Sequence, residues 1–375
     1  MLMKIIFQTI SNKKLYFSSI LAVGIISVTV LFSQSSNPEP FRPIEDFVLF
    51  GKEGVHLSED IQSLSGDIGS NKEIKIAEKS KIVGNLFSQE IKLTENTEID
   101  GNITTQQLEQ TSTTKILGTI SKEISFPIAQ IPDIPDFQIG TQDIEITQKD
   151  FILPSGSFRD IRVKENASLI MAGIYNLRSL RLENNSVILF NGLTILNIRN
   201  SFELGQDIIV TPKLSSLSVK EIKINTLVSE TIHIGNRSIL GFRLIAPNAV
   251  VEIGEEGLLR GSIWAREVEI EKNALVSKED SFEKESDPTK VVEDQGVKFI
   301  GNEILILFKN EATQSAIQQV VNLINGKVVG FIPNPLIVKI EVQTITLQDL
   351  NDKIQLIKNL NNPLIVGVMQ NLLAN

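Results

Sequence analysis

Cysteine is absent from the 375-residue chain, which also contains only two histidines and one tryptophan. Without cysteine the chain has no disulfide bond, thiolate metal site, cysteine nucleophile or cysteine-linked lipid anchor. Aromatic residues make up only 6% of the chain, and its 42% of hydrophobic residues consists mostly of Ile, Leu and Val. This bias favours β structure built from stacked aliphatic side chains. We therefore predict a mainly β protein that depends on its aliphatic core.

Acidic residues outnumber basic ones, and the excess grows when the first 35 residues are set aside. Those residues hold three lysines and no acid, so 36 − 3 = 33 basic and 45 acidic residues remain, a net charge of −12. A surface of this sign repels phosphate groups. We therefore expect no nucleic-acid partner.

Residues 1–35 differ from the rest of the chain. A basic start precedes the uncharged run LYFSSILAVGIISVTVLF at 15–32, and small polar residues follow it. This order is typical of an export signal, and the run is also long enough to span a bilayer. A cleaved signal peptide and a retained anchor both place the remainder in the cell envelope or outside the cell. In the second case residues 15–32 are the membrane contact, and the C-terminus lies outside.

A 17-residue repeat follows. Residues 73–89 read EIKIAEKSKIVGNLFSQ and residues 90–106 read EIKLTENTEIDGNITTQ, while 107–123 keep the spacing. The short alternating runs have strand periodicity, and a fixed period of this size indicates a β-solenoid with parallel strands ~4.8 Å apart. We expect the aligned Gly84, Gly101 and Gly118 to turn corners with positive φ. We expect Asn85 and Asn102 to stack amide to amide.

The repeat returns after a proline-rich segment. Related phrases recur between residues 161 and 277 at intervals of 17 to 19 residues, with Asn166, Asn185 and Asn273 at the polar corners. Asn tolerates the left-handed conformation that such corners need. We predict one parallel β-helix over 50–277, with 17–19 residues per coil. The proline-rich connector, 124–155, is expected to lie along its outside.

The coils resemble those of a known family. The 17-residue I-x-G-N units are similar to bactofilin-type, polymer-forming β-helices, and LIAPNAVVEIGEEGLLRGSIWAREVEI at 244–270 is similar to exported β-helix proteins found beside pilus and surface-layer components. This resemblance covers most of 50–277 and implies self-association through the solenoid ends. Bactofilins are cytoplasmic polymers, so the export signal departs from the family and a cytoskeletal function is not carried over.

A second domain follows an acidic segment at 278–297. The segment lacks the D-x-D-x-D-G spacing of a calcium loop, which favours a solvated linker over a calcium site. Beyond it, hydrophobic patterns predict strand, helix, two strands, helix and strand, and Thr346 with Asp349 forms a capping box for the second helix. The order βαββαβ predicts a small α+β ferredoxin-like domain over 298–375.

This domain resembles the N-terminal propeptide of subtilisin-like proteases, in particular the fervidolysin-type prodomain. The matching phrases are NEILILFK, INGKVVGFIP, LIVKIEV and LQDLNDKIQLIKNLNNPLIVGVMQN. The resemblance implies a sheet that packs on a protease, assists its folding and inhibits it, with the C-terminal tail in the substrate cleft. It makes Leu372, Leu373, Ala374 and Asn375 the candidate partner-binding residues. Gly367-Val368 stands where the family usually has an acid, a departure that bears on docking.

Catalytic groups are scarce. His56 and His233 each lie between inward aliphatic residues, so both should point outward, and neither has a second histidine to share a metal. Glu255-Glu256 reads as a solvated turn rather than a glycosidase pair. We therefore expect no catalytic site, cofactor or metal.

Three functions follow from these patterns. The favoured one is an exported, non-enzymatic β-helix scaffold that carries a propeptide-like binding domain. The first alternative is a trans-acting inhibitor or folding chaperone of a subtilisin-like protease, acting through 298–375. The second, least favoured, is a polysaccharide-active β-helix enzyme.

Overall fold

The computed structural model describes most of the chain after residue 41. The described residues are 42–122, 124–213, 217–278, 282–284, 286–294, 296–309, 312, 314–333, 335–344 and 346–373. The predicted export signal or anchor, 1–35, lies outside them. Within these ranges no helix is both long and apolar enough to cross a membrane.

The main body is a parallel β-solenoid of about 12 turns. Its first strands follow the short 3-10 helix η1 (Ile44–Asp46) and are β1 (Phe47–Leu57), β2 (Gln62–Ser65), β3 (Asp67–Ser70), β4 (Glu73–Ile76), β5 (Lys81–Val83), β6 (Leu86–Leu93), β7 (Glu98–Asp100), β8 (Ile103–Gln110), β9 (Lys115–Ile116) and β10 (Ile120–Ser121). The second set is β11 (Ile144–Ile146), β12 (Phe151–Leu153), β13 (Gly156–Val163), β14 (Ser168–Leu182), β15 (Val187–Leu204), β16 (Ile209–Pro212), β17 (Ile222–Thr226), β18 (Ile232–Ile234), β19 (Ile239–Ile253), β20 (Leu258–Ile270) and β21 (Leu275–Ser277), with η2 (Val219–Glu221) before β17.

Aliphatic ladders fill the solenoid. Ile74 aligns with Ile91, and Ile91 with Leu108, in the register that the 17-residue repeat predicts. Ile74 and Ile91 are fully buried, because alternate residues of each strand point into the tube. The predicted β-solenoid and its inward ladders are therefore confirmed.

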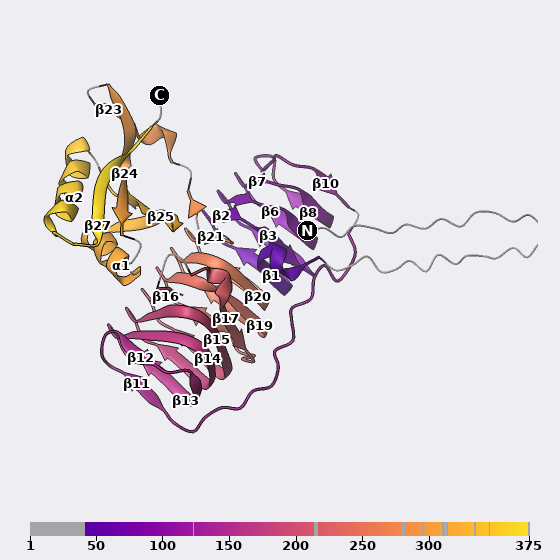
Figure 1. Ribbon diagram of the computed structural model, residues 1–375. Coiled ribbons are helices and arrows are strands. Elements are labelled where there is room, and N and C mark those ends of the chain that lie inside the picture. Colours follow the sequence, from indigo (N-terminus) through magenta and orange to yellow (C-terminus); the bar gives the residue numbers. More distant parts are fainter. Residues whose placement is uncertain are drawn as a thin grey trace, which may run out of the picture. The chain divides into compact units, whose positions relative to one another are not determined.

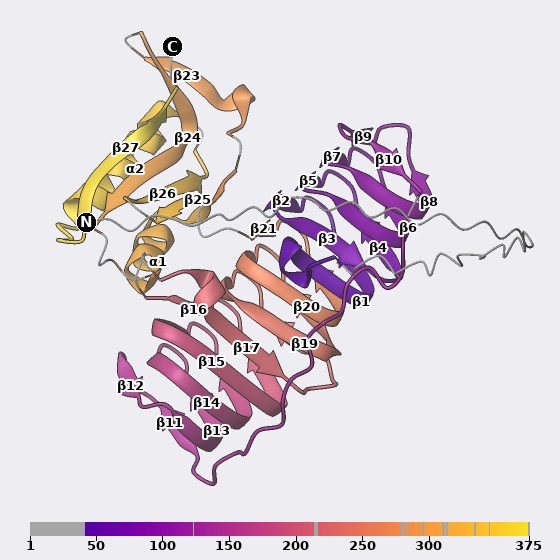
Figure 2. The same cartoon turned by 45° about the vertical axis from the view of Figure 1, so that its right-hand side comes forward.

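The turns do not stack in chain order. β1 pairs with β20 on one side and with β3 and β4 on the other. The last turn of the chain's solenoid thus lies against the first, as Figures 1 and 2 show where the indigo strand β1 meets the orange strand β20. We call this junction the seam. Both open ends of the stack consequently lie in mid-chain, at β8–β10 and at β11–β12.

The proline-rich segment joins these two distant ends. It runs along the outside of the stack (Figure 2) and packs Ile128 and Ala129 against Phe47, Phe50 and Trp264. The backbone N–H of Ile128 donates to Asn71 Oδ1 at 2.7 Å. Strands β11 and β12 lie inside the predicted connector range, 124–155, and belong to the solenoid.

Two turns are longer than the predicted 17–19 residues. Leu180 aligns with Phe202, 22 positions on, and Leu204 with Ile234, 30 positions on. The second of these turns contains η2 and the additional strand β17. The extra residues leave the inward ladders in register.

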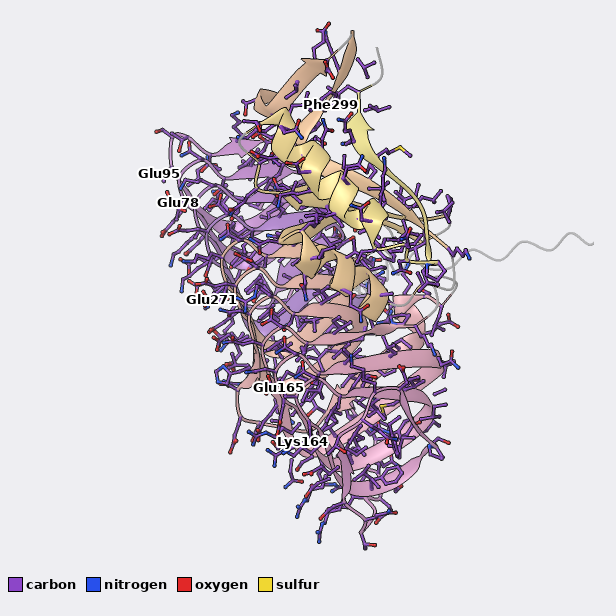
Figure 3. All side chains as sticks on the ribbon, turned by 90° about the vertical axis from the view of Figure 1, so that its left-hand side faces the viewer. Glu78, Glu95, Lys164, Glu165, Glu271 and Phe299 are labelled. Atoms are coloured by element: carbon purple, nitrogen blue, oxygen red, sulfur yellow. The ribbon has the colours of Figure 1, made fainter. Side chains whose placement is uncertain are left out.

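One edge of the solenoid is a column of left-handed corners. Asn166, Asn185 and Asn273 have φ of 61°, 57° and 60°, which confirms the predicted conformation. Positive φ also occurs at the corresponding corners, formed by Asp60, Lys79, Asn96, Asp207, Arg237 and Glu256. Figure 3 shows Glu78, Glu95, Glu165 and Glu271, which flank these corners, along one edge.

The glycine column has a different cause from the predicted one. Gly84 has φ of 141°, but Gly101 and Gly118 do not adopt positive φ, so the prediction is wrong for those two. A Cβ on Gly101 would lie 2.0 Å from the carbonyl oxygen of Gly84, and one on Gly118 would lie 2.3 Å from that of Gly101. Glycine is needed here because successive backbones approach too closely for any side chain.

The predicted amide stacking of Asn85 on Asn102 is also wrong. Asn85 Oδ1 instead accepts the backbone N–H of Asn102 at 2.9 Å. A ladder of side-chain amides does occur elsewhere, where Asn197 donates to Asn176 and Asn225 donates to Asn197, each at 2.8 Å.

The C-terminal part contains an antiparallel sheet. Its elements are β22 (Phe282–Glu283), η3 (Pro288–Lys290), β23 (Val291–Asp294), β24 (Val297–Phe308), α1 (Gln314–Leu323), β25 (Gly326–Pro333), β26 (Leu336–Val342), α2 (Leu347–Asn359) and β27 (Ile365–Leu372). β22 pairs with β25, and β23 with β24. The acidic segment expected to be a linker therefore adds two strands to this sheet.

The C-terminal part packs on an apolar outer face of the solenoid. Outward residues Ile170, Leu189 and Ile209 share a buried cluster with Ile317 and Val320 of α1. At the same face the guanidinium carbon, Cζ, of Arg260 lies 4.1 Å from the ring centre of Phe331.

Candidate functional site

The predicted tail residues end the last strand. Leu372 aligns with Phe299 of β24, and the backbone N–H of Leu373 donates to the carbonyl of Lys298 at 2.9 Å. Their side chains are 54% and 36% exposed. The other two predicted residues, Ala374 and Asn375, lie outside the described residues. The described tail is therefore paired to the sheet by its backbone, with its side chains open to solvent.

A polar cluster at the sheet also holds the tail. Asn371 Nδ2 donates to Glu303 Oε2 at 2.6 Å, and Ser286 Oγ donates to the same atom at 2.7 Å. Lys339 Nζ lies 3.6 Å from that oxygen and donates to the carbonyl of Lys284 at 2.6 Å. Glu303 and Lys339 are nearly fully buried. The cluster thus joins the acidic segment and the tail to one face of the sheet, and sequence periodicity gave no signal for it.

Helices α1 and α2 cover one face of the C-terminal sheet. Ile304 and Ile306 of β24 are buried with Val320 of α1 and Leu350 of α2. Because side chains alternate along a strand, Leu305 and Leu307 lie on the opposite face. The helices therefore do not cover this second face.

The second face is partly apolar and accessible. Leu305 aligns with Met369, and Leu307 aligns with Gly367 and Ile337. We call these five residues the open sheet face. Met369 is 48% exposed, and a Cβ on Gly367 would meet no atom within 4 Å. The face is therefore open at this position.

The two histidines have carboxylate neighbours. His56 Nδ1 lies 3.2 Å from Glu267, its Nε2 lies 3.4 Å from Glu73, and His233 Nδ1 lies 2.7 Å from Glu252. The side chains of His56 and His233 are 31% and 69% exposed, which agrees with the predicted outward orientation. Glu73, Glu252 and Glu267 come from other turns of the solenoid, so these pairs could not be predicted from the residues next to each histidine.

The candidate glycosidase pair diverges. Glu255 forms an ion pair with Lys272 at 3.3 Å, while Glu256 occupies a left-handed corner with φ of 58°. This geometry fits the solvated turn that the sequence predicts.

Comparisons with known proteins relate one part of the chain to a family. No curated protein matches the chain. A crystal structure of an ice-binding protein from the Antarctic ascomycete Antarctomyces psychrotrophicus aligns with 63% of this chain and 95% of its own, at 14% identity and a TM-score of 0.31. At that TM-score the alignment establishes no shared fold. The comparisons do not confirm the bactofilin resemblance of 50–277. Residues 285–366 match the family model of the fervidolysin N-terminal prodomain, so this part of the chain is similar to that prodomain.

Proposed function

We propose that the chain is an exported, non-enzymatic β-solenoid scaffold whose C-terminal domain binds a subtilisin-like protease in trans. The observation that carries the proposal is the prodomain match at 285–366, over a sheet with one face that the helices leave free. Lys284 and Ser286 cover part of that face, around Lys339 and Glu303, and leave the open sheet face beside them. The helices occupy the other face, so the open sheet face is the surface left for a partner.

The proposed domain has a ferredoxin-like arrangement. The element order β24–α1–β25–β26–α2–β27 supports this arrangement. So does the sheet, in which β25 pairs with β26, β26 with β24, and β24 with β27, all antiparallel. Strands β22 and β23 are then additions to a propeptide-like domain.

Inhibition requires more than binding to the open sheet face. In the related propeptides the tail enters the substrate cleft, whereas Leu372 and Leu373 here pair with β24. Asn371 is held by Glu303 at 2.6 Å. The tail would therefore separate from the sheet before it reached a cleft, and binding and inhibition are separable in this domain.

Truncation after Met369 tests this separation. The full chain is expected to inhibit peptide hydrolysis by a subtilisin-like protease with a Ki below roughly 10 μM. The truncated chain should still bind the protease, because it keeps the open sheet face, but should lose inhibition. Loss of binding on truncation, or no interaction by either chain, would count against the proposal.

A second candidate function is end-to-end assembly into rods. Leu108 and Ile116 at one end of the stack, and Ile144 and Phe151 at the other, are only partly buried against the solenoid core. The terminal strands also leave backbone groups available for pairing. A second copy stacked head to tail would continue the ladders at both ends, and such contacts form open filaments.

Negative-stain microscopy of residues 36–375 tests the assembly. Rods or filaments are expected, and Leu117→Asp should shorten them because this end residue is 63% exposed. The prediction fails if the particles are compact and single at every concentration.

A further inference from the structure

The seam brings together polar side chains from the two ends of the solenoid sequence. His56 of β1 aligns with Glu269 of β20 on the outside of the stack. The same outward column continues on both sides, through Glu252 and His233 in one direction and Lys75 in the other. The seam places Glu269 beside His56, whereas Lys75 belongs to the next turn of the chain.

The distances at His56 suit metal ligands. Its Nδ1 lies 3.2 Å from Glu267 Oε1, and its Nε2 lies 3.4 Å from Glu73 Oε1. One ligand atom from each of His56, Glu267 and Glu269 can be chosen so that all three lie within 4.8 Å of one another. Two ligands of a tetrahedral ion with bonds of ~2.1 Å lie about 3.4 Å apart. Small side-chain rotations would therefore bring one ligand atom each of His56, Glu267 and Glu269 onto one ion.

Gly54 leaves the space that the imidazole occupies. It aligns with Glu267 on one side and with Glu73 on the other, so the two carboxylates flank a position without a side chain. A Cβ there would lie 3.1 Å from His56 Nε2. That nitrogen is itself buried and has no hydrogen-bond partner among the described residues. The imidazole is thus held between carboxylates, with Nε2 at ion-pair distance from Glu73 but in no hydrogen bond within the described residues.

The charge around Glu269 is mostly negative. Glu252 aligns with Glu269 across β19 and β20, and Glu267 and Glu271 lie two positions before and after it in the chain. In the described part of the chain Glu269 forms no ion pair with a lysine or arginine. Lys75, the nearest basic residue of the column, is paired with Glu73 at 2.6 Å. A cation beside Glu269 would offset this repulsion.

We propose that His56, Glu267 and Glu269 bind one divalent transition-metal ion such as Zn²⁺ at the seam, with water completing its coordination. An imidazole nitrogen combined with carboxylate oxygens suits Zn²⁺ better than Mg²⁺ or Ca²⁺, which take oxygen ligands. The ion would link β1 to β20, strands that the chain separates by most of the solenoid. Because it binds the folded seam and not the unfolded chain, it would raise the thermal stability of the protein.

Titration of the full chain with Zn²⁺, after chelator treatment, tests the site. Calorimetry should give one ion per chain, Zn²⁺ should raise the unfolding temperature, and Co²⁺ in place of Zn²⁺ should give visible absorption bands. His56→Ala and Glu269→Gln should each weaken binding by at least about 10-fold. His233→Ala is the matched control, because His233 lies in the same outward column beside Glu252, and should leave binding unchanged.

Glu269→Gln conserves size, so it keeps the test decisive if His56→Ala does not fold. The proposal is overturned if the wild-type chain binds no stoichiometric ion. It is also overturned if both substituted chains bind Zn²⁺ as tightly as the wild type.

Discussion

Single glycines and asparagines determine how closely successive turns of this solenoid pack. The glycines of the repeat permit backbone contact between turns, since a Cβ on Gly101 would overlap the carbonyl oxygen of Gly84. Side-chain carboxamides complete the same corner, because Asn85 Oδ1 accepts the N–H of Asn102. The repeat shows that glycine recurs at these positions. Only the interatomic distances show that it recurs because the backbones of successive turns approach closely, and not because the backbone is left-handed there.

Gly101→Ala is expected to destabilise the protein. The added methyl group would lie 2.0 Å from the backbone oxygen of Gly84, so the two turns would have to move apart. We expect a loss of roughly 1–3 kcal/mol in urea unfolding. Gly367→Ala is the control, since its methyl group meets no atom within 4 Å, and it should change stability little. Equal effects of the two substitutions would contradict the account.

Glu183 should make stability depend on acid pH. The Arg162 guanidinium donates to Glu183 Oε1 at 2.7 Å and, with the Glu165 N–H and Lys164, lowers the pKa of Glu183 to about 2. In the unfolded chain a glutamate titrates near pH ~4.3. Its contribution is therefore fully present above that pH and is lost as the pH falls toward 2.

Thermal unfolding at several pH values measures this contribution. Glu183→Gln should flatten the fall in unfolding temperature between pH ~4.5 and ~2, because the substituted side chain does not titrate. An unchanged slope in the substituted chain would show that the Arg162–Glu183 contact does not stabilise the fold.

At the scale of strands, the sequence predicted much of the local structure and missed the long-range pairing. Alternation within each 17-residue block predicted the strands and their inward ladders, because these depend on neighbouring blocks. The seam depends on β1 and β20, which look like any other pair of coils in the sequence. Strands β22 and β23 were missed for a related reason, since they lie in an acidic segment and gain stability only by pairing with β25 and β24.

The seam predicts a specific engineered disulfide. Ser65 and Ser277 align across β2 and β21, with their Oγ atoms 3.1 Å apart. Because the native chain has no cysteine, Ser65→Cys with Ser277→Cys should give a single disulfide on mild oxidation. The shift in non-reducing gel mobility measures it.

Ser65→Cys with Ser121→Cys is the control pair. Ser121 lies in β10 at one open end of the stack, several turns from Ser65, so no intramolecular disulfide should form. If the turns stacked in chain order, Ser65 and Ser277 would lie at opposite ends and the first pair would not cross-link.

At the scale of the molecule, the chain combines a β-solenoid with a domain that is similar to a protease prodomain. The order of elements after residue 297 and the phrases they contain made that domain recognisable from sequence. The candidate binding surface was less predictable, because the open sheet face depends on which face the helices cover. The cluster at Glu303, which holds the tail, depends on residues from four separate segments. The seam cluster around His56 was hidden for the same reason.

Binding to a subtilisin-like protease whose catalytic serine is replaced by alanine tests whether the C-terminal domain binds such a protease in trans. The full chain should bind the immobilised protease saturably, and Met369→Asp, on the open sheet face, should weaken binding by at least about 10-fold. Leu356→Asp is the matched control, because Leu356 is similarly exposed, 49% against 48% for Met369, but lies on α2. The control should bind as tightly as the wild-type chain. No binding by the wild-type chain, or equal losses for the two substitutions, would contradict it.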